Sequence, residues 1–140
     1  MTVSFTKKAG QSEPTMNNKT EISSDLTTLE RMVLEVALHN SDQFAAHFKR
    51  QIEEAKVSVR TPSGVGFMTK LQVPDELSVK DEKTVDSLPM VYGEHPQLPS
   101  GAEFVLQIKE GCINCIEAFC YEGMWPDDES LFRVSIKENR

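Results

Sequence analysis

Long apolar runs are missing from this sequence of 140 residues, and so is an excess of positive charge. No stretch approaches the roughly 20 consecutive apolar residues that cross a bilayer. The N-terminus, MTVSFTKKAGQSEPT, lacks the apolar core of a secretory signal. We therefore expect no membrane partner and a cytoplasmic location. The net charge of −7 argues against direct binding of nucleic acid, because phosphate contacts need clustered Lys and Arg.

Cysteine and histidine are scarce, with three of each. All three cysteines fall within CINCIEAFC, where Cys112 and Cys115 have the C-x-x-C spacing of metal and redox sites. If this segment is a strand, alternation sends these two to opposite faces, roughly 10 Å apart along the strand. Cys112 and Cys120 share a face but lie about 26 Å apart. Because the histidines are isolated as well, we interpret the cysteines as small apolar side chains and expect no metal and no cofactor.

Signatures of catalysis and of nucleotide binding are also missing. The sequence has no G-x-S-x-G, Walker A, G-x-G-x-x-G or H-E-x-x-H motif. Gly64 and Gly66, in SGVGF, are too few to hold a phosphate and more simply mark a turn and a bulge. The sequence therefore predicts no catalytic residues.

Polarity divides the chain into an arm and a domain. Residues 1–24 are polar and show no sustained period, which is typical of a flexible arm. The length fits a single domain, which we place at residues 25–140.

Helical periodicity appears at the start of this domain. Thr27 and Glu30 have the spacing of a capping box, and an apolar stripe follows them at helical intervals: Leu29, Met32, Val33, Val36 and Ala37. A second helix, capped by Ser41 or Asp42, is predicted to run to about Ala55. Its apolar side would hold Phe44, Phe48, Ile52 and Ala55.

After Lys56 the period changes to the alternation of strands. Strands are predicted at 57–60, 65–73, 103–109, 112–121 and 131–136, with a short edge strand at 90–92. Helices first and strands afterwards favour an α+β fold, with two N-terminal helices packed on one face of an antiparallel sheet of about four or five strands.

Glu117 is the least expected residue of the predicted strand 112–121. Alternation places it with apolar neighbours on a strand that is apolar on both faces and therefore lies in the middle of the sheet. The predicted neighbours are Ile113, Cys115, Phe119 and Tyr121. One interpretation is a structural carboxylate bonded to the backbone, to Arg60 or to Lys70. The other is the acid of a pocket with Tyr121 and His95, which would make the chain a small enzyme or ligand-binding domain.

Acidic residues are concentrated in two segments. Residues 75–94 carry six acids and two lysines, and residues 117–130 carry five acids with no Lys or Arg. Such segments are either solvated surface or a docking face for a basic protein. Trp125, the only tryptophan, either anchors such an interface or covers the end of the core.

Three segments, taken together, resemble a family of small, largely uncharacterised bacterial proteins. They are TLERMVLEVAL, RTPSGVGFMTKLQVP and SGAEFVLQIKEGCINCIEAFCYEGMWP, in this order over about residues 28–126. The family pairs an LER-type helix with a GVGF-T segment and ends in a hairpin and a Tyr-Gly-x-x-Trp-Pro-like motif. Here Ile116-Glu117 replaces a leucine–glutamate pair, and Tyr121-Glu122-Gly123 replaces Tyr-Gly. The resemblance implies an α+β domain and brings no catalytic residues.

Small acidic bacterial proteins of this kind are similar in general character to immunity proteins, which neutralise a co-encoded toxin. Toxin nucleases are basic, and an acidic inhibitor associates quickly with such a surface. We therefore expect no enzymatic activity, and a cognate basic toxin domain as the partner. The predicted partner-binding residues are Glu122, Trp125, Asp127, Asp128 and Glu129, assisted by Asp81, Glu82 and Asp86.

Overall fold

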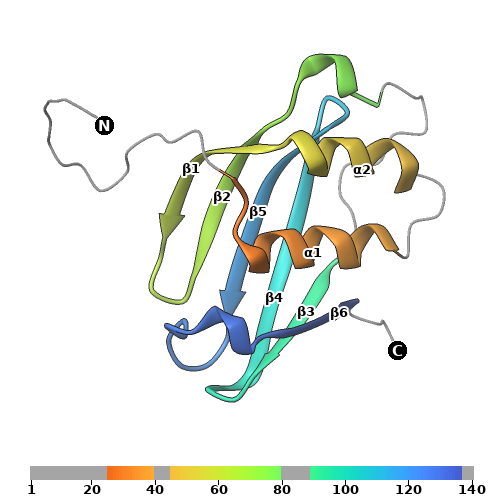
Figure 1. The fold of residues 1–140 in the computed structure, drawn as a ribbon. Helices are drawn as coiled ribbons and strands as arrows, with labels where there is room; N and C mark the ends of the chain where they lie inside the picture. The colour runs from red at the N-terminus through yellow and green to blue at the C-terminus, as the bar shows by residue number, and fades with distance from the viewer. Residues whose placement is uncertain (1–24, 40–44, 80–88, 137–140) are drawn as a thin grey trace, which may run out of the picture.

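The structure, a computed structural model, describes residues 25–39, 45–79 and 89–136, and of residues 45–47 only the backbone (Figure 1). Two helices precede six strands, so the predicted α+β fold is confirmed with slightly more strands than expected. The elements are α1 (Thr28–His39), α2 (Ala45–Glu54), β1 (Lys56–Pro62), β2 (Gly66–Gln72), the 3-10 helix η1 (Asp75–Leu77), β3 (Val91–His95), β4 (Leu98–Lys109), β5 (Cys112–Cys120), the 3-10 helix η2 (Glu129–Leu131) and β6 (Arg133–Ile136).

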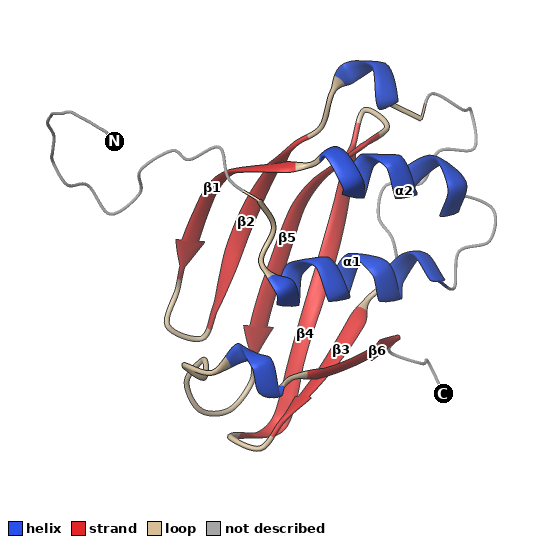
Figure 2. Cartoon of the chain, in the orientation of Figure 1, coloured by secondary structure: helices blue, strands red, loops and turns tan. Residues whose placement is uncertain are grey.

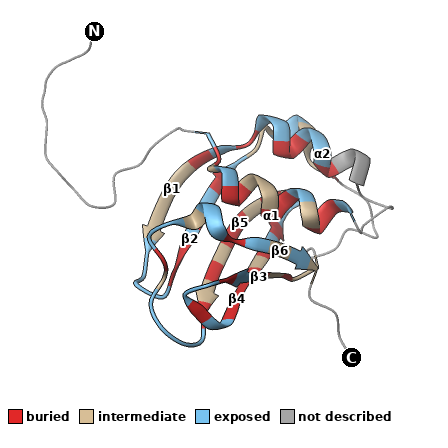
Figure 3. Ribbon diagram, turned by 60° about the horizontal axis from the view of Figure 1, so that its bottom comes forward, coloured by how far each residue is buried: buried red, intermediate tan, exposed pale blue. Residues whose placement is uncertain are grey.

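All six strands form one antiparallel sheet in the order β1-β2-β5-β4-β3-β6. The predicted mid-sheet position of β5 is confirmed. Both helices lie on one face of this sheet (Figure 2). The core is one cluster of apolar side chains between the helices and that face, and buried positions alternate along the strands (Figure 3).

The first helix begins as the sequence predicts. The Thr27 N–H donates to Glu30 Oε1 at 2.8 Å, and the Glu30 N–H donates to Thr27 Oγ1 at 3.1 Å, so the capping box is present. The predicted apolar stripe faces the sheet: Leu29, Val33 and Ala37 are buried, while Met32 and Val36 pack partly buried against the core. In the second helix Phe48 and Ile52 are buried as expected; the predicted caps and Phe44 lie outside the described residues.

A β-bulge interrupts the pairing of β4 with β5. Gln107 lies opposite Cys115, but its neighbour Ile108 lies opposite Ile113, so β5 has one residue more than β4 at this point. Strict alternation therefore fails between Ile113 and Cys115.

The bulge overturns the prediction that Cys112 and Cys115 point to opposite faces. Cys112 lies opposite Lys109 and Cys115 lies opposite Gln107. Because Gln107 and Lys109 are two residues apart on β4, both cysteines are on the same face, the one away from the helices. Cys115 is buried and Cys112 is half-buried.

The same bulge corrects two further face assignments. Cys120 packs in the helix-side core, so it does not share a face with Cys112 as predicted. Ile113 is also in that core, whereas Glu117 lies on the opposite face with Cys115 and Phe119. Of its predicted neighbours, Glu117 therefore shares a face with Cys115 and Phe119, the Tyr121 ring packs on Phe119, and only Ile113 lies on the other face.

The predicted edge strand near residue 90 is not at an edge. In the structure β3 extends to His95 and lies between β4 and β6. The two prolines that follow, Pro96 and Pro99, do not produce a long loop. Instead β3 and β4 form a tight hairpin with a bulge near His95, and β4 starts at Leu98.

Only one of the two glycines in SGVGF has the predicted role. Gly64 has a φ of +88° in the β1–β2 turn, as expected. The bulge lies instead between Val57 and Val59 of β1. Gly66 is needed for another reason, because a Cβ there would overlap the backbone carbonyl of Ala118 on β5.

Candidate functional site

The segment of residues 121–131 follows β5, includes η2 and lies at the same end of the sheet as the β1–β2 turn (Figure 1). Two backbone hydrogen bonds join the end of β5 and this segment to the β1–β2 turn. The Cys120 N–H donates to the Val65 carbonyl, and the Trp125 N–H donates to the Gly64 carbonyl, each at 2.9 Å. We call residues 63–65 and 121–131 together the loop end. Its two parts lie side by side although they are far apart in the sequence.

Trp125 fixes this segment to the core. Its half-buried ring packs edge-on against Phe67 and Phe104, with centroids 5.5 and 6.0 Å away, and tilted on Phe132 at 5.0 Å. Its Nε1–H donates to Glu129 Oε2 at 2.8 Å. Of the two interpretations of Trp125, the structure shows that it covers the end of the core. Through these contacts it holds the loop end against the core.

The acidic side chains of this segment point largely to solvent. Glu122, Asp127 and Asp128 are exposed, and Glu129 is half-buried beneath Trp125. Asp128 caps η2 by accepting from the Ser130 hydroxyl and from the Ser130 N–H. These hydrogen bonds, the hydroxyl first, lower the pKa of Asp128 below its usual range and keep it charged.

Exposed apolar side chains lie among these acids, and the sequence analysis did not single them out as a group. Their exposed fractions are 44% for Val65, 63% for Tyr121, 75% for Met124 and 48% for Leu131. The sequence feature that could have identified them is an apolar residue within a polar loop, as at Met124. The proximity of Val65 could not be seen, because it depends on the backbone bonds between two distant segments.

The residues of the alternative pocket are not gathered in one cleft. His95 is buried and packs against Phe132 of the core, with ring centroids 4.8 Å apart. Its Nδ1 accepts from the Gln97 N–H at 3.1 Å, so its Nε2 carries the proton and donates to the Asp128 carbonyl at 2.8 Å. His95 is thereby a structural residue of the hairpin.

Glu117 and Tyr121 lie away from His95. Glu117 is half-buried on the sheet face without helices, opposite Met68 and Val105. Tyr121 follows β5, and its hydroxyl donates to Glu103 Oε1 at 2.9 Å. Arg60, considered as a partner of Glu117, binds Glu30 instead.

The predicted assisting acids Asp81, Glu82 and Asp86 lie outside the described residues. Within the described ranges, no group of three or more His, Cys, Asp or Glu side chains could hold a metal ion. None of the helices in that part of the chain is long and apolar enough to cross a membrane.

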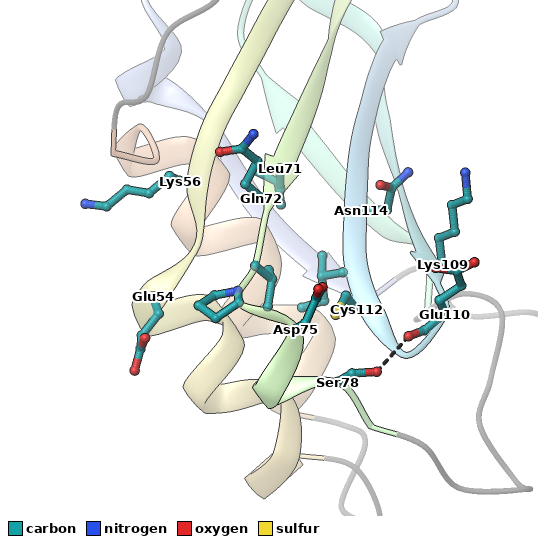
Figure 4. A pocket seen from close by; sticks show the side chains of 13 residues that line it. Glu54, Lys56, Leu71, Gln72, Asp75, Ser78, Lys109, Glu110, Cys112 and Asn114 are labelled. Atoms are coloured by element: carbon teal, nitrogen blue, oxygen red, sulfur yellow. Dashed lines mark hydrogen bonds between the residues drawn. The ribbon is translucent and has the colours of Figure 1, made fainter.

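A hollow of about 1060 Å³ is at the opposite end of the sheet (Figure 4). The β4–β5 turn, the end of β2 and η1 line it, and the Ser78 hydroxyl donates across its edge to the Glu110 carbonyl at 2.7 Å. Its charged side chains, Lys56, Asp75 and Lys109 among them, are exposed. A smaller hollow of about 500 Å³ lies between α1 and β6. Neither has the buried, convergent polar groups of a ligand pocket.

Compared with known proteins, the chain matches no family model, no curated protein and no solved structure.

Proposed function

We propose that this protein is an immunity-type inhibitor, which binds a cognate basic toxin domain through the loop end and so neutralises it. The observation that carries the proposal is the position of the acids: Glu122, Asp127 and Asp128 project to solvent from a loop that is bonded to a neighbouring turn. A charged surface held in place before binding attracts an opposite surface without the cost of ordering the loop.

The charge pattern supports a basic protein as the partner and a nuclease as the class of toxin. Residues 117–130 carry no Lys or Arg, and the whole chain has a net charge of −7. Such a surface repels phosphate, whereas a nuclease has a basic surface that phosphate normally occupies. An acidic protein on that surface would exclude the nucleic acid, and no chemistry by this chain would be required.

Co-expression of the full chain with the toxin domain encoded beside its gene tests this proposal. We expect protection of bacterial growth and a stable complex in a pull-down. The association rate should fall steeply as the salt concentration rises, because steering between exposed charges is screened by ions.

A matched pair of charge-reversal variants locates the surface. The double variant Glu122→Lys and Asp127→Lys changes the loop end, and the control Glu35→Lys and Glu53→Lys makes the same change in net charge on exposed positions of α1 and α2. We expect the first to slow association by about tenfold or more and the control to associate nearly as fast as the wild type. Equal growth of toxin-producing cells with and without this protein would contradict the proposal. So would an association rate that changes neither with salt nor in either variant.

A further inference from the structure

We infer that Val65, Tyr121 and Met124 form the contact centre of the loop end, and that the partner is a basic protein that presents an apolar side chain to them. The inference rests on the proposed function for the identity of the partner, but its chemistry is independent of that identity.

The fold brings the backbones of these three residues close to one another. Val65 accepts a backbone hydrogen bond from Cys120, the residue before Tyr121, and Gly64 accepts one from Trp125, the residue after Met124. Each apolar residue is therefore within one position of a bond that joins the two segments. The exposed fractions of 44%, 63% and 75% leave a substantial part of each side chain uncovered.

This exposure is not a defect in the packing of the core below. Trp125 lies in the same segment and closes that end of the core on Phe67 and Phe104. The segment thus buries its tryptophan while it leaves Tyr121 and Met124 in water. Contiguous exposed apolar patches rimmed by polar residues are characteristic of sites where proteins meet.

Tyr121 is also held ready for contact. Its ring packs edge-on against Phe119, with centroids 5.4 Å apart, and its hydroxyl donates to Glu103, whose exposed fraction is 4%. A ring fixed in this way loses little conformational freedom when a partner covers it. Tyrosine is among the residues most enriched where interfaces derive their binding energy.

The surrounding acids decide which partner fits. Glu122, Asp127 and Asp128 border the apolar residues in sequence and are exposed. An apolar centre with an acidic border complements a protein surface with an apolar side chain ringed by Lys or Arg. The two parts have separate roles, because border charges mainly set the association rate while buried apolar contacts mainly set the dissociation rate.

The first experiment measures both rates for the full chain and the neighbouring toxin domain. We expect Met124→Ser to raise the dissociation rate by about tenfold with little change in association, the reverse of the Glu122→Lys and Asp127→Lys variant. Met68→Ser is the matched control, because Met68 is an exposed methionine on β2, opposite Glu117, and is not one of the residues of the loop end. If the complex of the Met124→Ser variant dissociates at the wild-type rate, the inference is overturned and the proposed function stands.

The second experiment needs no toxin. Two synthetic peptides, Lys-Lys-Leu-Phe-Leu-Lys-Lys and a twin with serine in place of the apolar residues, are titrated into the full chain and followed by NMR amide shifts. We expect at least about tenfold tighter binding of the apolar-centred peptide, with shifts concentrated at the loop end, since burial of one large apolar side chain suffices for this ratio.

Met124→Ser should remove most of this preference and Met68→Ser should keep it, with Val65→Ser and Tyr121→Ser made alongside. Equal affinity for both peptides, or shifts concentrated elsewhere on the protein, overturns the inference. If the apolar-centred peptide binds more tightly as expected but no complex with the toxin forms, the immunity proposal alone is overturned. The failure of the inference and the failure of the proposed function are therefore distinguishable.

Discussion

Glu30 connects α1 to two strands of the sheet through its carboxylate. Its exposed fraction is 1%, and its carboxylate accepts from the Thr27 N–H, from the Thr69 hydroxyl and twice from Arg60. The capping box could be read from the sequence, because it depends on residues three positions apart. The bonds to Arg60 and Thr69 could not, because they join α1 to β1 and β2 across the core.

Replacement of Glu30 by glutamine should therefore destabilise the fold. The variant removes the negative charge and leaves the Arg60 guanidinium without its counter-charge, which we expect to lower the free energy of unfolding by about 3 kcal/mol. Urea unfolding followed by circular dichroism measures the loss. Glu35→Gln, at an exposed position of the same helix, is the control and should change stability by less than about 0.5 kcal/mol. Equal stability of the two variants would contradict a structural role for the ion pair.

The same carboxylate predicts a dependence of stability on pH. Burial raises the pKa of Glu30, but the hydrogen bonds from Arg60, Thr69 and Thr27 outweigh it and hold the pKa below the usual value of 4.5. A lowered pKa in the folded state means that the stabilisation is full above the usual value and is lost as the pH falls through the folded value. Unfolding midpoints from neutral pH to about pH 3 should thus fall more for the wild type than for Glu30→Gln. Parallel curves would show that Glu30 contributes nothing to acid sensitivity.

At the scale of the elements, the side chain of Gln51 attaches α2 to the β4–β5 turn. Gln51, fully buried, donates through Nε2 to the carbonyls of Leu77 and Gly111 and accepts from the Ile113 N–H, each at 2.8 Å. These bonds satisfy backbone groups where the hairpin turns and η1 passes beneath α2. Helical spacing gave no hint of this role, because a polar residue on an amphipathic helix is expected to face water.

Gln51→Leu should keep the volume and lose all three hydrogen bonds. Because buried backbone groups are then left unsatisfied, we expect a loss of about 2 kcal/mol in the free energy of unfolding. Hydrogen exchange at the Ile113 amide should accelerate as well, which a general loss of packing would not single out. Gln72→Leu, at an exposed position of β2, serves as the control. An Ile113 amide that exchanges as slowly as in the wild type would contradict the proposed attachment.

At the scale of the whole molecule, the described residues have one core, in which residues of α1, α2 and the strands form a single cluster. Trp125 packs against it at one end, and Gln51 is fully buried toward the other. No part of the described chain has an apolar cluster of its own that could survive the loss of the rest.

We therefore expect one cooperative unfolding transition. The fluorescence of Trp125, the only tryptophan, reports the loop end, and far-UV circular dichroism reports the helices and the sheet. In urea the two signals should give the same midpoint, because small domains with one core unfold in a two-state manner. A fluorescence change that precedes the change in circular dichroism would show that the loop end separates from the core first.

Local spacing determined much of this protein. The two helices, the capping box of α1, the central position of β5 and the α+β class all follow from periodicities over a few residues, and the structure confirms them. The acidic segment that forms part of the candidate site was also visible, because charge is a property of composition. Its proposed partner remains a prediction.

Only the tertiary structure decided which side chains meet. The bulge in β5 moves Cys112 and Cys115 to one face, and alternation cannot reveal it because the extra residue is defined by the partner strand. Trp125 turns inward to the core, while backbone hydrogen bonds place the turn that carries Val65 beside the segment that carries Tyr121 and Met124. The last of these outcomes depends on hydrogen bonds between segments about 60 residues apart in the sequence. The sequence alone therefore determined the elements and the sign of the charge, and the fold determined which residues a partner can touch.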